Sequence, residues 1–289
     1  MYLIEIPEKQ IKKYLPEDLS ECDGRQYIEM CALIFGFQTE QITYDEFRIH
    51  ALYKLLDMKP VKRGQTDVEK HSKIYQLSEL LDSFFDIEDD KKVIKQYYNQ
   101  NPLPKFLSGI HDYIGPKNEE DFTFGAYLDT LEAFVDFNQT GDTVFLLKML
   151  AINYRKKSIF KHINQRRREN YTFQLESRID QFKTNHIGII YGFYLFFASV
   201  HKYISTAKIF VHGNEIDMTV LFDSPTKKTV ESSLPGLGMK SVLYSLAESG
   251  IYGNIDSVRN TPLWEVLIRM YDVTKRNEDE KAQLKKQGL

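Results

Sequence analysis

Residues 115–157, GPKNEEDFTFGAYLDTLEAFVDFNQTGDTVFLLKMLAINYRKK, carry the clearest structural pattern in the chain. Apolar residues recur there at three- and four-residue spacing and form one helical stripe, made of Phe124, Tyr127, Leu128, Leu131, Phe134 and Val135. Asp129 falls on the opposite, acidic face. Gly141 then predicts a left-handed helix end and Asp142 the cap of a new helix. Because residues 144–152 are apolar almost throughout, the second helix is expected to be buried, and the stretch predicts a helical hairpin.

The composition of the whole chain is that of a folded protein with a sizeable core. Its 289 residues are 42% hydrophobic and 13% aromatic. A net charge of -3 gives no overall attraction to nucleic acid or to an anionic membrane. The first residues lack the basic and apolar regions of a signal peptide, so the chain is expected in the cytoplasm. Cys22 and Cys31 are too few for a disulfide framework and are expected to be structural.

The N-terminal region is predicted to form one short strand and three helices. The strand covers residues 2–6, and the helices cover residues 26–35, 43–58 and 66–85. Thr43 with Glu46, and Thr66 with Glu69, have the spacing of capping boxes. The acidic residues 87–92 are more typical of a solvated turn than of a metal site. The paired prolines at 102 and 104 predict a boundary between an N-terminal lobe, 1–101, and a C-terminal lobe, 102–289.

The C-terminal region adds more helices and one β-hairpin. Residues 187–200 form the most apolar run, which is too short to cross a bilayer and predicts a buried helix. Gly188 and Gly192 lie on one face of that helix and would let another helix approach closely. Strands at 208–211 and 218–222 predict a hairpin, and a helix is expected at 239–249. Another helix is expected from Thr261 until the charged tail, residues 277–287, ends its apolar pattern. The predicted fold class is therefore mainly α, a multi-helix bundle in two lobes with a small β-hairpin component.

A strongly basic run, residues 155–168, is the main anomaly in charge. It contains seven cations and no acid: Arg155, Lys156, Lys157, Lys161, Arg166, Arg167 and Arg168. Interleaved aromatics, Tyr154 and Phe160, suit the stacking of nucleic-acid bases. The alternative is a solvated segment whose charge balances acidic faces nearby, and we favour this second interpretation.

No motif in the sequence predicts catalysis. The adjacent His111 and Asp112 resemble a base and its orienting carboxylate, but neighbours on an extended chain point apart, so a turn is the better interpretation. The glycine-rich LPGLGMKS, residues 234–241, lacks the glycine that a Walker motif places directly before its lysine. No enzymatic activity, cofactor or metal is expected.

Three segments resemble an uncharacterised family from the tail gene clusters of phages and prophages of Bacteroidota. They are GPKNEEDFTFGAYLD with FLLKMLAINYR in the stretch quoted above, YGFYLFFASVHKYI at 191–204, and MKSVLYSLAESGIYGNIDSVRNTPLWEVL at 239–267. The resemblance implies a role in phage tail assembly. The expected activity is that of a chaperone binding the tape-measure protein in the cytoplasm of the bacterial host. The alternatives are a structural component of the tail or neck of the virion, and a nucleic-acid-binding protein that uses the basic run.

The partner-binding surface is predicted on the last helix. Its apolar stripe is flanked by large rings that often anchor interfaces, and the candidate residues are Trp264, Leu267, Met270 and Tyr271. Other phage tail proteins are the expected partners, and a homo-oligomer is left open. Neither nucleic acid nor a membrane is expected to bind.

Overall fold

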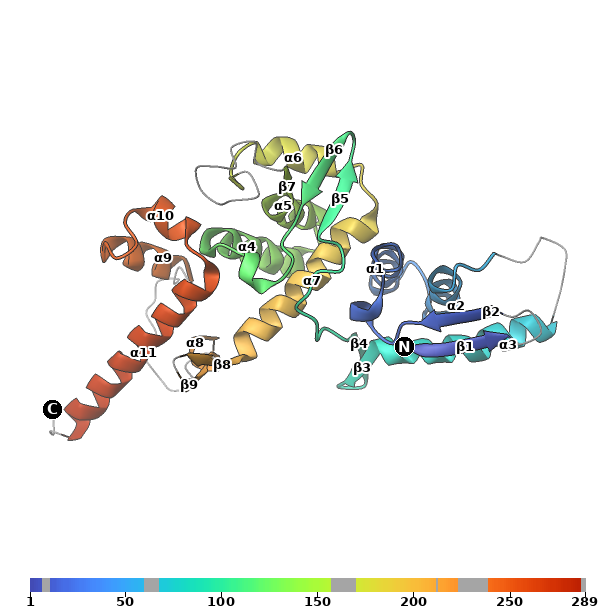
Figure 1. The fold of residues 1–289 in the computed structure, drawn as a ribbon, viewed down its shortest axis with the longest axis horizontal. Coiled ribbons are helices and arrows are strands. Elements are labelled where there is room, and N and C mark those ends of the chain that lie inside the picture. The colour runs from blue at the N-terminus through green and yellow to red at the C-terminus, as the bar shows by residue number, and fades with distance from the viewer. Residues whose placement is uncertain (7–10, 60–67, 157–169, 212, 223–238, 287–289) are drawn as a thin grey trace.

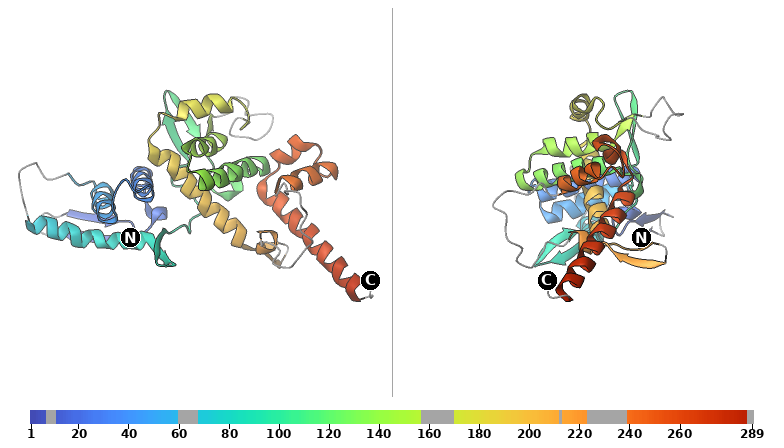
Figure 2. Two further views of the ribbon diagram at one scale, coloured as in Figure 1. Left: turned by 180° about the vertical axis from the view of Figure 1, so that it is seen from behind. Right: turned by 90° about the vertical axis from the view of Figure 1, so that its left-hand side faces the viewer.

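The computed structural model describes residues 1–6, 11–59, 68–156, 170–211, 213–222 and 239–286. The molecule is elongated, and its helices form successive groups along the long axis (Figure 1). Helix α7, Ile187–Thr206, runs diagonally through the middle, and the N-terminal elements lie on one side of it. The last helix, α11, Leu263–Lys286, extends away from the body at the opposite end, as the left view of Figure 2 shows.

The predicted fold class underestimated the β content, because the fold is mixed α/β and not a helical bundle with one hairpin. The described residues form eleven α-helices and four small antiparallel sheets of two or three strands. The strand at 2–6 and one hairpin were predicted, but the pairing in three of these sheets was missed for a physical reason. Their strands are four or five residues long at most, and so short a strand offers too few alternating positions to compete with a helical period.

The N-terminal elements combine two hairpins with three helices. The first strand and the three helices were expected, whereas the strand at residues 11–15 was not. The hairpin of β3 and β4 turns at Asp89 and Asp90, whose φ angles of 47° and 61° are those of a tight hairpin turn. The elements are β1 Tyr2–Ile6, β2 Ile11–Leu15, α1 Gly24–Gln38, α2 Tyr44–Leu55, α3 Val68–Ser78, a 3-10 segment Glu79–Phe84, β3 Phe85–Glu88 and β4 Lys91–Ile94.

The predicted capping boxes have different outcomes. The capping box of Thr43 and Glu46 is confirmed at the start of α2. The one that pairs Thr66 with Glu69 falls on residue 66, which lies outside the described residues.

The central elements include the helical hairpin that the sequence predicts. Helix α4 ends at Gly141, which has a φ of 70°, and the Asp142 carboxylate accepts a hydrogen bond from the Val144 N–H at 2.9 Å, as expected. Val135 is 42% exposed, so the predicted apolar stripe is narrower than the sequence indicated. The elements are β5 Lys105–Ser108, β6 His111–Ile114, α4 Phe124–Thr140, α5 Thr143–Asn153, β7 Arg155–Lys156 and α6 Leu175–Phe182.

The C-terminal elements differ from prediction in two places. The second strand of the predicted hairpin lies at 214–217 and not 218–222, where a short helix forms instead. Helix α11 also continues through the charged residues that were expected to end it. The elements are β8 Lys208–Val211, β9 Asn214–Asp217, α8 Thr219–Phe222, α9 Met239–Glu248 and α10 Ile255–Asn260, followed by α11.

The two predicted lobes meet where α1 crosses α7. A Cβ atom on Gly188 would lie 1.9 Å from the carbonyl oxygen of Ile28, and one on Gly192 would lie 2.9 Å from the ring of Tyr27. The prediction that these glycines permit a close helix approach is therefore confirmed. The Tyr27 hydroxyl donates to the Gly192 carbonyl at 2.7 Å and lies 3.0 Å from the Tyr98 hydroxyl, so the crossing also satisfies a buried carbonyl.

Candidate functional site

The predicted partner-binding residues on α11 divide into buried and half-exposed positions. Leu267 is fully buried in the core, so it supports the helix from within. Trp264, Met270 and Tyr271 are half-buried and pack against the edge of that core. The Trp264 ring meets the ring of Tyr203 on α7 edge-to-face, with centroids 6.4 Å apart.

Helix geometry places the two largest of these rings together. Trp264 and Tyr271 are seven residues apart, which is nearly two turns, so they lie on one side of α11 with Ile268 between them. Together with Tyr203, which is 40% exposed, they form a partly exposed apolar ridge, here called the α11 ridge: Tyr203, Trp264, Ile268 and Tyr271.

Beyond the ridge, α11 has no packing partner among the described residues. From Lys275 to Leu284 every side chain is exposed. Asp272 holds the start of this projecting part through ion pairs with Arg269 at 2.8 Å and with Arg276 one turn later. The apolar ridge therefore borders a charged helix that stands free in solvent (Figure 1).

The structure describes only the first two residues of the predicted basic run. Arg155 is only 7% exposed and lies in β7, where it pairs with Ile114 of β6. Lys156 is half-buried, and Lys157, Lys161, Arg166, Arg167 and Arg168 lie outside the described residues, as does Phe160. The Tyr154 ring, offered for base stacking, is 1% exposed and its hydroxyl donates to the Leu103 carbonyl at 2.5 Å. Tyr154 and Arg155 are therefore part of the core and do not form a nucleic-acid surface.

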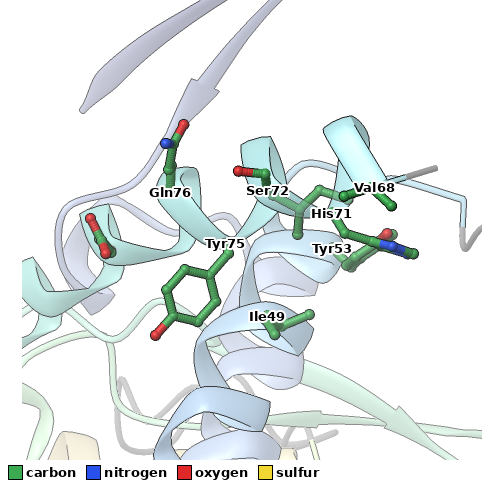
Figure 3. Close-up of a pocket in the computed structure, with 9 residues that line it drawn as sticks. Ile49, Tyr53, Val68, His71, Ser72, Tyr75 and Gln76 are labelled. Carbon is green, nitrogen blue, oxygen red and sulfur yellow. The ribbon is translucent and has the colours of Figure 1, made fainter. Parts of the chain in front are cut away.

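A groove lies between α2 and α3 (Figure 3). It has a volume of about 820 Å³, and its walls are Ile49 and Tyr53 of α2 and Val68, His71 and Tyr75 of α3. A volume of this order is typical of small-ligand sites. Its wall, however, brings no nucleophile and base into reach, because His71 and Ser72 are adjacent on a helix and project in different directions.

Beside this groove, a guanidinium is stacked between two aromatic rings. Arg48 is 7% exposed, and its guanidinium carbon lies 5.2 Å from the ring centroids of both Tyr44 and Tyr75. It bonds to Asp45 at 2.6 Å, and Asp82 lies 3.9 Å away. This arrangement ties α2 to α3 and to the segment after it, which is a structural role.

A second polar cluster fastens α10 to α4. Arg259 forms an ion pair with Asp129, and its Nε donates to the Tyr171 hydroxyl at 2.9 Å. Asp129 is only 22% exposed, so the acidic face predicted for α4 is partly an internal contact surface. Sequence reasoning missed this because the partner residues lie far along the chain.

Three further side chains with potentially reactive groups, His201, Cys22 and Cys31, lie in apolar surroundings. The His201 ring stacks on Phe197, and the Tyr127 hydroxyl lies 2.7 Å from its Nδ1, while burial lowers the pKa of the imidazole. Burial likewise raises the pKa of both thiols, Cys22 and Cys31, so neither is activated as a nucleophile. Among the described residues, no group of three His, Cys, Asp or Glu side chains is arranged to hold a metal ion.

His111 and Asp112 lie in strand β6 and not in the expected turn. Both are exposed, and as strand neighbours they point to opposite faces of the sheet. The arrangement therefore does not bring a base and its orienting carboxylate together.

Helix α7 is longer than the sequence predicted, with 20 residues. Of the helices in the described part, it alone has the length and apolar composition needed to cross a membrane. Within its 18-residue apolar stretch, 67% is buried inside the protein. Burial of this kind is what the core helix of a folded domain shows.

No protein-family model, curated protein or solved structure matches this chain.

Proposed function

We propose that this protein is a non-enzymatic assembly factor that binds another protein through the α11 ridge. The observation that carries the proposal is the placement of Trp264 and Tyr271, half-exposed at the base of a helix that projects from the body. Large amphipathic rings with few rotamers are the side chains that most often anchor protein interfaces. An apolar ridge along a helix fits a partner that is itself helical and has an apolar face.

The partner proposed for this ridge is the tape-measure protein of a phage tail, in the cytoplasm of the bacterial host. The resemblance of three segments of the chain to a phage tail family supports this choice. A long apolar helical protein needs to be kept soluble before the tail tube forms around it. The charged, projecting end of α11 would keep such a complex in solution while the ridge covers apolar surface.

The experiment is co-purification of the tape-measure protein with Trp264→Ala and with wild type. We expect the variant to lose the partner while its melting temperature changes by no more than a few degrees, because the ring is half-exposed. Tyr244→Ala on α9 is the matched control, since Tyr244 is an aromatic residue that is 46% exposed and belongs to another helix. Retention of the partner by Trp264→Ala would contradict the proposed surface.

Mass spectrometry of purified phage particles tests the kind of role. An assembly chaperone is absent from the finished particle, whereas a structural component of the tail or neck is present in it. Detection of the protein at a fixed number of copies per particle would replace the chaperone proposal with the structural one.

A further inference from the structure

The hairpin of β5 and β6 has a free strand edge whose geometry follows from its register. The Gly115 N–H donates to the Pro104 carbonyl at 2.9 Å, which marks these two residues as a hydrogen-bonded pair. Hydrogen-bonded and non-bonded pairs alternate along an antiparallel ladder, so Phe106 pairs with Tyr113 through main-chain bonds. The main-chain groups of Lys105 and Leu107 therefore point away from β6.

These outward-pointing groups of β5 are not used within the described part of the chain. Strand β6 has β7 on its other side, so β5 alone forms this edge of the sheet. No hydrogen bond from the described residues reaches the main chain of Lys105 or Leu107. The side chain of Leu107 is 64% exposed, and that of Ile110 in the turn is 89% exposed. An open edge with exposed aliphatic side chains is a template for pairing with another strand.

We propose that β5 pairs with β5 of a second copy of this chain, antiparallel, about a two-fold axis at Phe106. In that register Lys105 of one copy lies opposite Leu107 of the other. These are the two residues whose N–H and C=O groups point outward, so each donor meets an acceptor without any shift of the strand. The result is one continuous six-stranded sheet with a closed, two-fold symmetric interface.

Charge on the exposed face of the hairpin complements itself in the same register. Leu107 pairs with Asp112 across the hairpin, so these two side chains and that of Lys105 share one face, and all three are exposed. Neither Lys105 nor Asp112 has an ion-pair partner among the described residues. In the two-fold pair the Lys105 stem crosses Leu107 of the second copy, and its ammonium group points toward Asp112 of that copy.

Analytical ultracentrifugation of the purified full chain, over a series of concentrations, tests this pairing without any tail partner. We expect a monomer–dimer equilibrium for wild type. Leu107→Pro should sediment as a monomer and keep its melting temperature, because the Leu107 N–H points to solvent and is not used by β6. The outcome is thus separate from the proposed function, which is read by co-purification.

A matched control is offered by another free strand edge, that of β8, which also carries an exposed aromatic. The Met218 N–H donates to the Ala207 carbonyl at 2.9 Å, so the same alternation makes the N–H of Phe210 in β8 point outward. Phe210 is 75% exposed, and Phe210→Pro should leave the dimer intact. Loss of the dimer in this variant would overturn the proposal in favour of the β8 edge.

Charge reversal tests the same interface without touching the main chain. Lys105→Glu and Asp112→Lys should each weaken the dimer, and the double variant should restore it, because in the proposed register the ammonium group of each copy approaches the carboxylate of the other. The proposal is overturned if wild type is monomeric at every concentration, or if Leu107→Pro and Lys105→Glu both sediment as wild type does.

Discussion

The crossing of α1 on α7 and the contact of α2 with α3 are two helix pairs packed in opposite ways. At the first, two glycines let the backbones touch, and the Tyr27 hydroxyl reaches the carbonyl of Gly192. At the second, large side chains such as Tyr53 and Tyr75 stand between the helices, and a groove of about 820 Å³ is left open. The stacked guanidinium of Arg48, on α2, joins this second pair through the ring of Tyr75 on α3.

The difference shows that side-chain size at the facing positions sets how tightly two helices pack. Absence of a side chain at Gly188 and Gly192 allows a dense interior, where an added methyl group has no space. Long side chains on both α2 and α3 keep those helices apart and leave room for further atoms. The two pairs should therefore respond differently to the same kind of substitution.

Gly188→Ala should have the largest effect. Its new Cβ would lie 1.9 Å from the Ile28 carbonyl oxygen, which is main chain and has no rotamer to relieve the clash. We expect destabilisation of about 3 kcal/mol, measured by urea unfolding monitored by circular dichroism. Gly36→Ala in α1 is the control, since its Cβ would meet only the Ile42 side chain at 3.6 Å, and it should be neutral or stabilising. Equal losses in the two variants would contradict the tight crossing.

Tyr27→Phe should have the next largest effect. It removes the hydrogen bond to the Gly192 carbonyl and leaves the fully buried Tyr98 hydroxyl with one partner fewer, at a cost of about 1.5 kcal/mol. Tyr53→Phe in the groove of α2 and α3 is the matched variant, and we expect its stability to match that of wild type in the same urea titration. A neutral Tyr27→Phe would show that the hydroxyl does not contribute to the crossing.

The far end of α7 should show a dependence on pH. Burial lowers the pKa of His201 below its ordinary value of 6.5, so the folded state binds a proton less readily than the unfolded state does. Stability from this group is therefore fully present above about pH 6.5 and is lost as the pH falls through that value toward the folded-state pKa. The melting temperature of wild type should therefore fall between about pH 7.5 and about pH 5.5, in part because His201 gains a proton. His201→Gln should remove that part of the fall. An unchanged pH profile in the variant would assign the fall to other groups.

Ser72→Leu should have the smallest effect. Ser72 is exposed and lines the groove, so the larger side chain fills open space between α2 and α3 without displacing any neighbour. We expect a change within about 0.5 kcal/mol of wild type by urea unfolding. A loss as large as that of Gly188→Ala would mean that the groove is closed in solution and that the two helix pairs are packed alike.

Much of the candidate site could not have been found from the sequence. The spacing of Trp264 and Tyr271 identifies one side of α11, but only packing shows that Leu267 faces inward while the two rings stay half-exposed. The ion pair of Asp129 with Arg259 joins residues that are 130 positions apart, and no local pattern in the sequence relates them. The basic run appeared in the sequence as one unit, yet its first residue, Arg155, is held in a sheet and buried.

The sequence by itself determined the long helices and their caps, because a helix of three or more turns repeats its apolar period often enough to be recognised, and its ends depend on residues within one turn. It also determined the close helix approach at Gly188 and Gly192, since a helix face that lacks side chains lets another helix come close whatever the surrounding structure. Only the tertiary structure decided the pairing in the three other sheets, the face of α4 that meets α10 and the open edge of β5. These features depend on pairings between segments distant in the chain, and the free energy of such a pairing comes from the partner as much as from the residues themselves.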